Sequence, residues 1–529
     1  MANRSMLLNF VSIGAVLAAG PAIAAPPTTA PAPAAHTTVE ETSLGTVAGY
    51  DAPRNIAMDT DANHVAFVGV RDKEQFVVLD GKSGPPFDQV MAESLEFSPK
   101  GSHLGYLVQT ATETLPVIDG KPGKGYYSIA HNRIFWSADG KRTAYAAQFQ
   151  NGGGAMIVDG VEGTHYDAAD IPLFSFDSLH LAYIARRGKS QCIVLDGKEQ
   201  KFYDAVGHVT FSPNSKHLTY EAIVNGKAML VMDGQEGKAY DLIEIGPGFS
   251  SDGARLVAVV AQAGKLLIVV NGRESAPFDA LLRGDFILSP DGKHIAYAVK
   301  QANQQFVIND GVSLPAFDHI GAYSLVFSPD SKRLAYEAGD AGPGHEYVVV
   351  DGVKGKNCDG VLSGTPFFSP DSKRVAYGAR RKTANNKNAT QFVIDGVEGK
   401  LYEDQPPLRE GEKARPGVEL PAYQMFSPDS RHFAYRAFSA ERPIAVIDSV
   451  ESPPAEAIGP IVFSPDNKHW AYLHVRDDKT YLVLDGTEVA GPYNPLSPRM
   501  VVLFDDATTL HVIATRKDEF LRVKVKINP

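Results

Sequence analysis

The sequence has very little cysteine and tryptophan, and it lacks any long basic run. Two cysteines among 529 residues exclude a disulfide-stapled scaffold. We expect Cys192 and Cys358 to be small buried side chains without a disulfide bond between them. The formal net charge of -11 is offset by no cluster of lysine or arginine, which argues against a nucleic-acid or anionic-membrane partner.

The usual signatures of catalysis and metal binding are also missing. There is no G-x-S-x-G elbow, Walker loop, H-E-x-x-H helix or cysteine pair at metal spacing. We therefore expect a protein that is not an enzyme and that needs no cofactor or metal ion. Beyond the N-terminal segment no stretch reaches the ~18 apolar residues that a membrane-spanning helix requires, so we expect no membrane span.

The N-terminal 46 residues read as an export signal followed by a linker. Residues 1–25 contain one basic residue, an apolar run and a small-residue end, Ala22-Ile23-Ala24-Ala25, a pattern typical of a cleaved signal peptide. Residues 26–46 begin with proline, alanine and threonine and are predicted to form an extended linker. The expected location of the mature protein is periplasmic or secreted.

A repeat of about forty residues fills the rest of the chain. Its clearest copy is the ten-residue segment Phe327-Ser-Pro-Asp-Ser-Lys-Arg-Leu-Ala-Tyr336. Further copies begin at Phe97, Trp136, Phe174, Phe211, Phe249, Leu288, Phe368, Phe426 and Phe463, with weaker ones at Met58 and Phe504. We count twelve copies in all.

Two shorter motifs follow each copy. The first is an apolar run ending in Asp-Gly, as in Val349-Val350-Asp351-Gly352, and the second is an aromatic residue followed by an acid, as in Phe317-Asp318. Pro-Asp-Ser is a turn sequence, and the apolar runs on both sides of it have the length and composition of strands. Each repeat is therefore predicted to be four short strands. Consecutive apolar residues in the middle strands require both faces of the sheet to be covered.

Four strands in about forty residues is the spacing of one β-propeller blade. The repeated Phe-Ser-Pro-Asp-Ser-Lys-x-Leu-Ala-Tyr line resembles the TolB-type, WD40-like propeller repeats of exported bacterial proteins, and the resemblance covers nearly the whole chain from Arg54 to Ile527. It implies an all-β propeller. TolB also carries a small α/β domain before its propeller, and nothing between Ala25 and Thr46 matches that domain, so TolB's own partner is not implied.

Twelve repeats close in one of two ways. Propellers usually have four to eight blades, so we favour two six-bladed rings, with repeats 1–6 in residues 47–279 and repeats 7–12 in residues 280–529. The alternative is one twelve-bladed ring, in which the segment at Tyr50-Asp51 completes the last blade. No linker separates the two halves near residue 271, which favours the single ring.

Candidate binding residues are the ones that differ between copies. Seven of the fifteen histidines occupy one repeat position, which indicates a solvated hairpin rather than metal ligands. Residues at the head of the innermost strand vary, and they include Arg133, His208, Asp285 and Tyr423. These four are our candidates for the channel mouth, although water-exposed positions at the start of a strand explain them as well.

One interval of the repeat is longer than the others. Ser369 and Ser427 lie 58 residues apart, and the extra stretch, residues 403–422, has no apolar periodicity that could add a strand. It is predicted to be an inserted, exposed loop, a common carrier of binding residues. Tolerated insertion without function is the alternative. The candidate partner-binding residues of the loop are Arg409, Glu410, Lys413 and Arg415.

The function that these observations favour is an exported, non-catalytic propeller scaffold that binds a protein or another component of the cell envelope through its loops. A propeller enzyme, such as a lactonase or a lyase-like hydrolase with a site at the channel mouth, is one alternative. Convergence of Arg133, His208 and Asp285 would favour it. A sensor of a small ligand or glycan is a third possibility, which the scarcity of tryptophan weakens.

Overall fold

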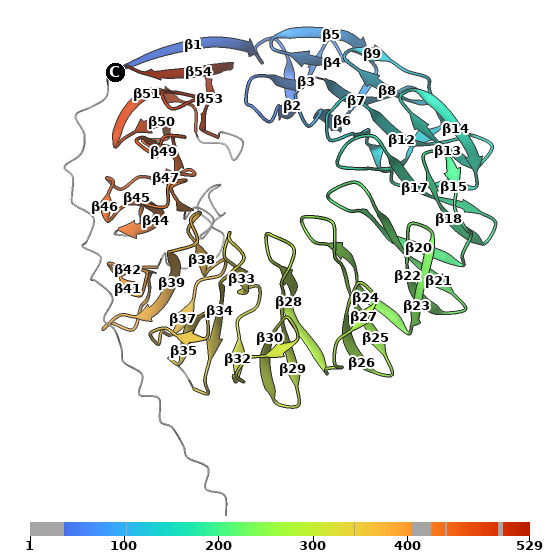
Figure 1. The fold of residues 1–529 in the computed structure, drawn as a ribbon. Helices are drawn as coiled ribbons and strands as arrows, with labels where there is room; N and C mark the ends of the chain where they lie inside the picture. The colour runs from blue at the N-terminus through green and yellow to red at the C-terminus, as the bar shows by residue number, and fades with distance from the viewer. Residues whose placement is uncertain are drawn as a thin grey trace, which may run out of the picture.

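The computed structural model describes residues 36–101, 103–342, 344–404, 425–439, 442–495 and 501–528. These residues form twelve separate antiparallel sheets, which are arranged as blades around a common centre (Figure 1). The chain is thus the all-β propeller that the repeat predicts. Within the described ranges, no helix is long and apolar enough to cross a membrane.

The strands of the first four blades follow the predicted order along the chain. Blade 1 contains β2 (Asp51–Met58), β3 (Val65–Arg71), β4 (Glu74–Leu79) and β5 (Lys82–Phe87). Blade 2 contains β6 (Gln89–Phe97), β7 (Leu104–Gln109), β8 (Thr114–Ile118) and β9 (Lys121–Pro122). Blade 3 contains β10 (Ser128–Ile129), the short helix η1 (Ala130–Asn132), β11 (Phe135–Trp136), β12 (Thr143–Gln148), β13 (Gly154–Val158) and β14 (Val161–Tyr166). Blade 4 contains β15 (Ala168–Ala169), β16 (Leu173–Phe174), β17 (Leu181–Arg187), β18 (Ser190–Leu195) and β19 (Lys198–Glu199).

The middle blades repeat this plan. Blade 5 contains β20 (Ala205–Phe211), β21 (Leu218–Val224), β22 (Lys227–Met232) and β23 (Gln235–Tyr240). Blade 6 contains β24 (Leu242–Phe249), β25 (Leu256–Gln262), β26 (Lys265–Val270) and β27 (Arg273–Glu274). Blade 7 contains β28 (Ala280–Leu288), β29 (Ile295–Gln301), β30 (Gln304–Asn309) and β31 (Val312–Ser313). Blade 8 contains β32 (His319–Ile320), β33 (Val326–Phe327), β34 (Leu334–Gly339), β35 (Glu346–Val350) and β36 (Val353–Lys354).

The last four blades complete the ring. Blade 9 contains β37 (Gly360–Val361), β38 (Phe367–Phe368), β39 (Val375–Lys382), β40 (Asn388–Ile394), β41 (Val397–Glu398) and β42 (Tyr402–Glu403). Blade 10 contains β43 (Met425–Phe426), β44 (Phe433–Ser439), β45 (Arg442–Ile447) and β46 (Val450–Glu451). Blade 11 contains β47 (Ala457–Ile458), β48 (Val462–Phe463), β49 (Trp470–Arg476), β50 (Lys479–Leu484) and β51 (Thr487–Tyr493). Blade 12 contains β52 (Leu503–Phe504), β53 (Thr509–Arg516), β54 (Glu519–Ile527) and the N-terminal β1 (Thr37–Thr46).

The structure has one twelve-bladed ring, and our preferred arrangement of two six-bladed rings is wrong (Figure 1). Blade 6 packs directly on blade 7, and the two share a core that includes Val257, Ile268, Ile295 and Tyr297. This interface resembles those between other neighbours. Blade 7 therefore already covers the face of blade 6 that would pack on blade 1 in a six-bladed ring. The shared apolar core leaves no boundary between two rings at residues 279 and 280.

Ring closure depends on β1, which lies in the segment that we predicted to be a linker. β1 pairs antiparallel with β54, from Thr37 opposite Ile527 to Thr46 opposite Glu519, and so provides the outer strand of blade 12. Most residues of β1 are exposed, and its sequence is mainly polar. It therefore has no apolar pattern from which a strand could be predicted. The expectation that the chain near Tyr50 completes the last blade is confirmed, but the strand itself ends at Thr46.

In six blades a backbone N–H in the turn after the innermost strand donates a hydrogen bond to the next blade. In blade 8 the buried Ser328 hydroxyl donates to the Asp330 carboxylate (2.7 Å) and accepts the backbone N–H of Arg333 (3.0 Å). The backbone N–H of Asp330 then donates to Ser372 Oγ in blade 9 at 2.9 Å. The same donation to the next blade recurs from Asp139, Asp177, Asp291, Asp371 and Asp429.

The seven histidines at the shared repeat position are structural as well. Each one is partly exposed and pairs through Nδ1 with the aspartate of the Asp-Gly turn in its own blade, at 2.5 to 2.8 Å. Where the repeat has arginine, as at Arg333, the side chain binds Asp351 and also donates to the carbonyl oxygens of Ser372 and Lys373 in the next blade. Where it holds arginine, this position therefore links neighbouring blades, which is more than the solvated hairpin that we expected.

The aromatic residue of the third motif also packs across a blade boundary. Phe317 of blade 7 lies edge to face with Tyr336 of blade 8, with ring centroids 6.1 Å apart. Tyr50 packs in the same way on Phe67 at 5.6 Å, which shows that Tyr50 belongs structurally to blade 12. Cys192 and Cys358 are both buried and free, as predicted.

Removal of β1 should open the ring at one place. A chain starting at residue 48 loses the β1–β54 ladder and the contacts of Glu41, whose carboxylate binds the Arg516 guanidinium at 2.6 Å and the Tyr493 hydroxyl at 2.8 Å. We expect amide exchange in β53 and β54 to accelerate by at least about tenfold, because a terminal blade frays without its closing strand. A chain starting at residue 36 is the control and should exchange like the full chain; equal protection in both truncated chains would contradict the role of β1.

The serine–aspartate turns should make stability sensitive to acid. Hydrogen bonds from the Ser289 hydroxyl and the Lys293 N–H lower the pKa of Asp291 from 3.8 to about 2. A carboxylate with a lowered pKa stabilises the fold fully above its unfolded pKa, and the contribution disappears as the pH falls toward the folded pKa. The melting temperature should therefore drop between pH 4 and pH 2, with a smaller drop in Asp291→Asn. Asp72→Asn, outside these turns, should keep the wild-type profile, which calorimetry over this range can check.

Candidate functional site

At some positions one or a few blades have a residue that differs from the repeat. The structural role of the repeat does not explain these residues, so they are the candidates for function. One such position follows the tyrosine of the second strand. Most blades have an apolar residue or glycine there, for example Val68, Leu107, Ala146, Ile184, Val259, Ala298, Gly378 and Leu473. Three blades have a charged residue instead, namely Glu221, Glu337 and Arg436. Burial of a charge in a sheet interface is costly, so each of these requires a partner or a function.

A groove of about 600 Å³ lies between the inner strands of blades 1, 2 and 3. Its lining residues are Asn55, Ile56, Ala57, Met58, Thr60, Leu95, Glu96, Phe97, Ser98, Pro99, Arg133, Phe135 and Trp136. Eight of these thirteen residues are apolar and five are polar or charged, so the lining is mixed. This composition is typical of a ligand or protein-binding groove.

Arg133 is the predicted channel-mouth residue that contributes to this groove. The inner strand of blade 3 is interrupted by η1, where His131 has a φ of 58°. Arg133 follows this break, and its guanidinium binds the Glu96 carboxylate of blade 2, with Nη2 to Oε2 at 2.8 Å. The Arg133 side chain is 57% exposed, so the pair offers charges of both signs beside the aromatic wall.

Three other copies of the same position have a buried structural role. Ser94 donates to the Met91 carbonyl at 2.6 Å and accepts the Leu107 N–H at 2.7 Å, which ties the first strand of blade 2 to the second. Ser324 and Thr365 make the corresponding bonds in blades 8 and 9. The variable position is therefore a hydroxyl bridge in these blades and a groove residue at Arg133.

His208, the second predicted residue, forms a separate pair in blade 5. Its Nδ1 lies 2.6 Å from Glu221 Oε2, and the Glu221 side chain is 9% exposed. The histidine thus compensates one of the three unusual buried charges. Arg133 and His208 bind different carboxylates in different blades, so the structure does not bring them together.

The structure describes no side chain for the remaining predicted residues. Asp285 belongs to β28 of blade 7, and only its backbone is described. Tyr423 and the four loop residues Arg409, Glu410, Lys413 and Arg415 lie outside the described residues.

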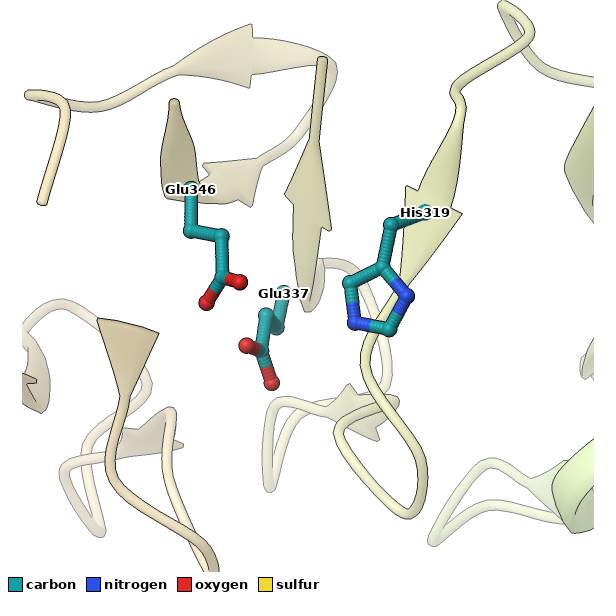
Figure 2. Close-up of side chains that lie close together, drawn as sticks. All are labelled: His319, Glu337 and Glu346. Carbon is teal, nitrogen blue, oxygen red and sulfur yellow. The ribbon is translucent and has the colours of Figure 1, made fainter. Parts of the chain in front are cut away.

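A cluster that the sequence analysis missed lies in blade 8. His319 of β32, Glu337 of β34 and Glu346 of β35 extend toward one another from three strands (Figure 2). One nitrogen or oxygen atom of each residue lies within 4.8 Å of the corresponding atoms of the other two. His319 is exposed, whereas both glutamates are partly buried. We call these three residues the blade 8 cluster.

Burial and the neighbouring Glu346 carboxylate raise the pKa of Glu337 from 4.5 to about 7. The backbone N–H of Val361 in blade 9 and the more distant charge of Arg380 act in the opposite direction and are weaker. No ion pair among the described residues of blade 8 includes either glutamate. Two adjacent carboxylates are costly to ionise together, and the charge of Arg380 in blade 9 offsets only part of that cost for Glu337.

A signal for the cluster was present in the sequence. The repeat places an amide or hydroxyl residue at the position of Glu346 in several blades, and Gln75, Gln191 and Gln305 use the side-chain oxygen to accept an N–H of the next blade. Glutamate there, glutamate after Tyr336 and histidine after Asp318 are three departures within one repeat. Comparison of the copies position by position would have found them.

The comparisons with known proteins assign neither a family nor an activity. No protein-family model matches the sequence, and no curated protein shows significant similarity to it. Similar solved structures include TolB from Acinetobacter baumannii, with 15% identity over 51% of this chain and 80% of that chain and a TM-score of 0.22. A Dos1 propeller has 10% identity over 60% and 90% of the two chains, with a TM-score of 0.27. The tricorn protease has 12% identity over 88% and 55%, with a TM-score of 0.26.

Proposed function

We propose that this protein is an exported, non-catalytic propeller whose inner groove, between blades 1 and 3, binds a segment of a protein partner in the cell envelope. The observation that carries the proposal is the pairing of Arg133 with Glu96 at the edge of an aromatic wall formed by Phe97, Phe135 and Trp136. Aromatic and arginine side chains dominate the binding energy of protein interfaces. Export rests on the signal-like residues 1–25.

The geometry also favours a binding role over the enzymatic alternative. That alternative depends on several polar side chains that converge on one reacting centre. Arg133 is paired with Glu96, and His208 is paired with Glu221 in another blade. The groove contains one charge pair and mainly apolar walls, which suits recognition of a mixed protein surface.

Charge reversal in the groove should abolish partner capture. Arg133→Glu places two like charges beside each other at Glu96, so it disrupts the groove without removing a buried side chain. We expect capture of a defined protein from an envelope extract, measured by quantitative mass spectrometry, to fall at least about tenfold, as loss of a central interface arginine does.

The matched control is Arg187→Glu, because Arg187 forms a comparable exposed pair with Glu199 at 2.7 Å on the outer part of blade 4. Capture by this variant should equal that of the wild type. If both variants capture the same protein equally well, the groove is not the binding surface. Detection of the full-length chain with residues 1–25 intact in the periplasm would separately contradict the proposed cleavage after export.

A further inference from the structure

The blade 8 cluster brings together three donor atoms that are far apart in the sequence. His319 begins the innermost strand, Glu337 lies near the end of the next strand, and Glu346 begins the third. Gly339 pairs with both His319 and Glu346 across the sheet, so the three side chains lie around one end of the blade. Figure 2 shows the two carboxylates and the imidazole ring extending into the same space.

The repeat gives no structural reason for this combination. The position of His319 holds alanine in several other blades, as at Ala168, Ala205 and Ala280. In the other blades the position of Glu337 normally holds a small or apolar residue, and the position of Glu346 normally holds an amide or hydroxyl residue. Three independent departures have thus occurred in one blade, and the fold places all of them within 4.8 Å.

The space beside Glu337 is kept open by Gly321. A Cβ atom at Gly321 would lie 2.0 Å from Glu337 Oε2, and a Cβ atom at Gly360 would lie 3.5 Å from Glu346 Oε2. Larger residues at position 321 would therefore displace the carboxylate. His319 is exposed, so an ion from solvent can reach the cluster from this side.

The two carboxylates and the imidazole of the blade 8 cluster determine which class of ion would bind there. Two adjacent carboxylates favour a divalent cation, and an imidazole nitrogen favours Zn²⁺ or a similar transition-metal ion over Ca²⁺ or Mg²⁺. Ligand atoms about 2.1 Å from one tetrahedral ion lie roughly 3.4 Å apart. From their present separation of up to 4.8 Å, the ligand atoms would need to approach one another by up to about 1.4 Å to reach this geometry.

We propose that His319, Glu337 and Glu346 bind one divalent transition-metal ion, with a remaining coordination position open to water or to a ligand. The ion joins the first three strands of blade 8 at the end that lies opposite the serine–aspartate turn. It also neutralises the two carboxylates at the boundary with blade 9. This site is separate from the groove of blades 1 to 3, and it does not depend on the proposed function.

The test is Zn²⁺ binding by the full chain without an affinity tag, after treatment with a chelator. Isothermal titration with ZnCl₂ should show one site that is lost or weakened at least about tenfold in His319→Ala and in Glu346→Gln, because each removes one of three protein ligands. Co²⁺ titration gives a second readout, since a site of low coordination number produces visible absorption bands that the variants should lack.

His208→Ala is the matched control, because it removes a histidine that faces only one carboxylate, Glu221. This variant should keep the wild-type stoichiometry and affinity, and circular dichroism should show that all three variants are folded. Glu337→Gln provides a further variant of similar shape. The proposal fails if the wild type binds no Zn²⁺ at 100-fold molar excess of metal over protein, or if His319→Ala and Glu346→Gln bind it as the wild type does.

Discussion

The ring depends on the hydrogen bond that passes from the turn of one blade to the turn of the next. In the six described turns that form this bond, the buried motif serine donates to its aspartate. The N–H of that aspartate donates to the side chain that follows the aspartate or asparagine of the next turn, which is a serine or, in blade 11, Asn467. The bond fixes the distance between successive blades at one end of the sheets. An arginine at the neighbouring position adds a second link at the same end, for example from Arg333 to Ser372 and Lys373.

The stability of the ring is distributed over twelve similar interfaces, and six of them contain this turn-to-turn bond among the described residues. Each interface buries a small apolar core, such as the one shared by blades 1 and 2 around Val68 and Tyr106. No blade can cover both of its faces alone, so every blade requires two neighbours. The first and last blades meet this requirement through Phe67 and Phe520, which pack at 5.9 Å, and through the pairing of β1 with β54.

Because the twelve blades are so similar, a residue that differs from the repeat in one blade indicates a special role. A charged residue in a position that is apolar elsewhere is costly, and the protein compensates Glu221 with His208 in blade 5. Blade 8 has one such carboxylate, Glu337, together with Glu346 and His319, and blades 2 and 3 have a charge pair beside aromatic side chains. These departures lie in separate parts of the ring. One rigid scaffold can therefore carry more than one site, because each blade varies without altering its neighbours.

The sequence by itself determined the repeat unit, the four strands of each blade and the propeller class, because turn residues and apolar runs act locally. Ser328, Pro329 and Asp330 specify a turn wherever they occur, and Leu334 to Tyr336 continue into a strand. Tertiary structure alone decided the number of rings, since closure depends on the angle between blades that pack through many weak contacts. It also decided the role of β1, whose polar residues pair with a strand more than 470 residues away. The blade 8 cluster likewise exists only in three dimensions, because strand pairing brings His319, Glu337 and Glu346 together at one end of a sheet.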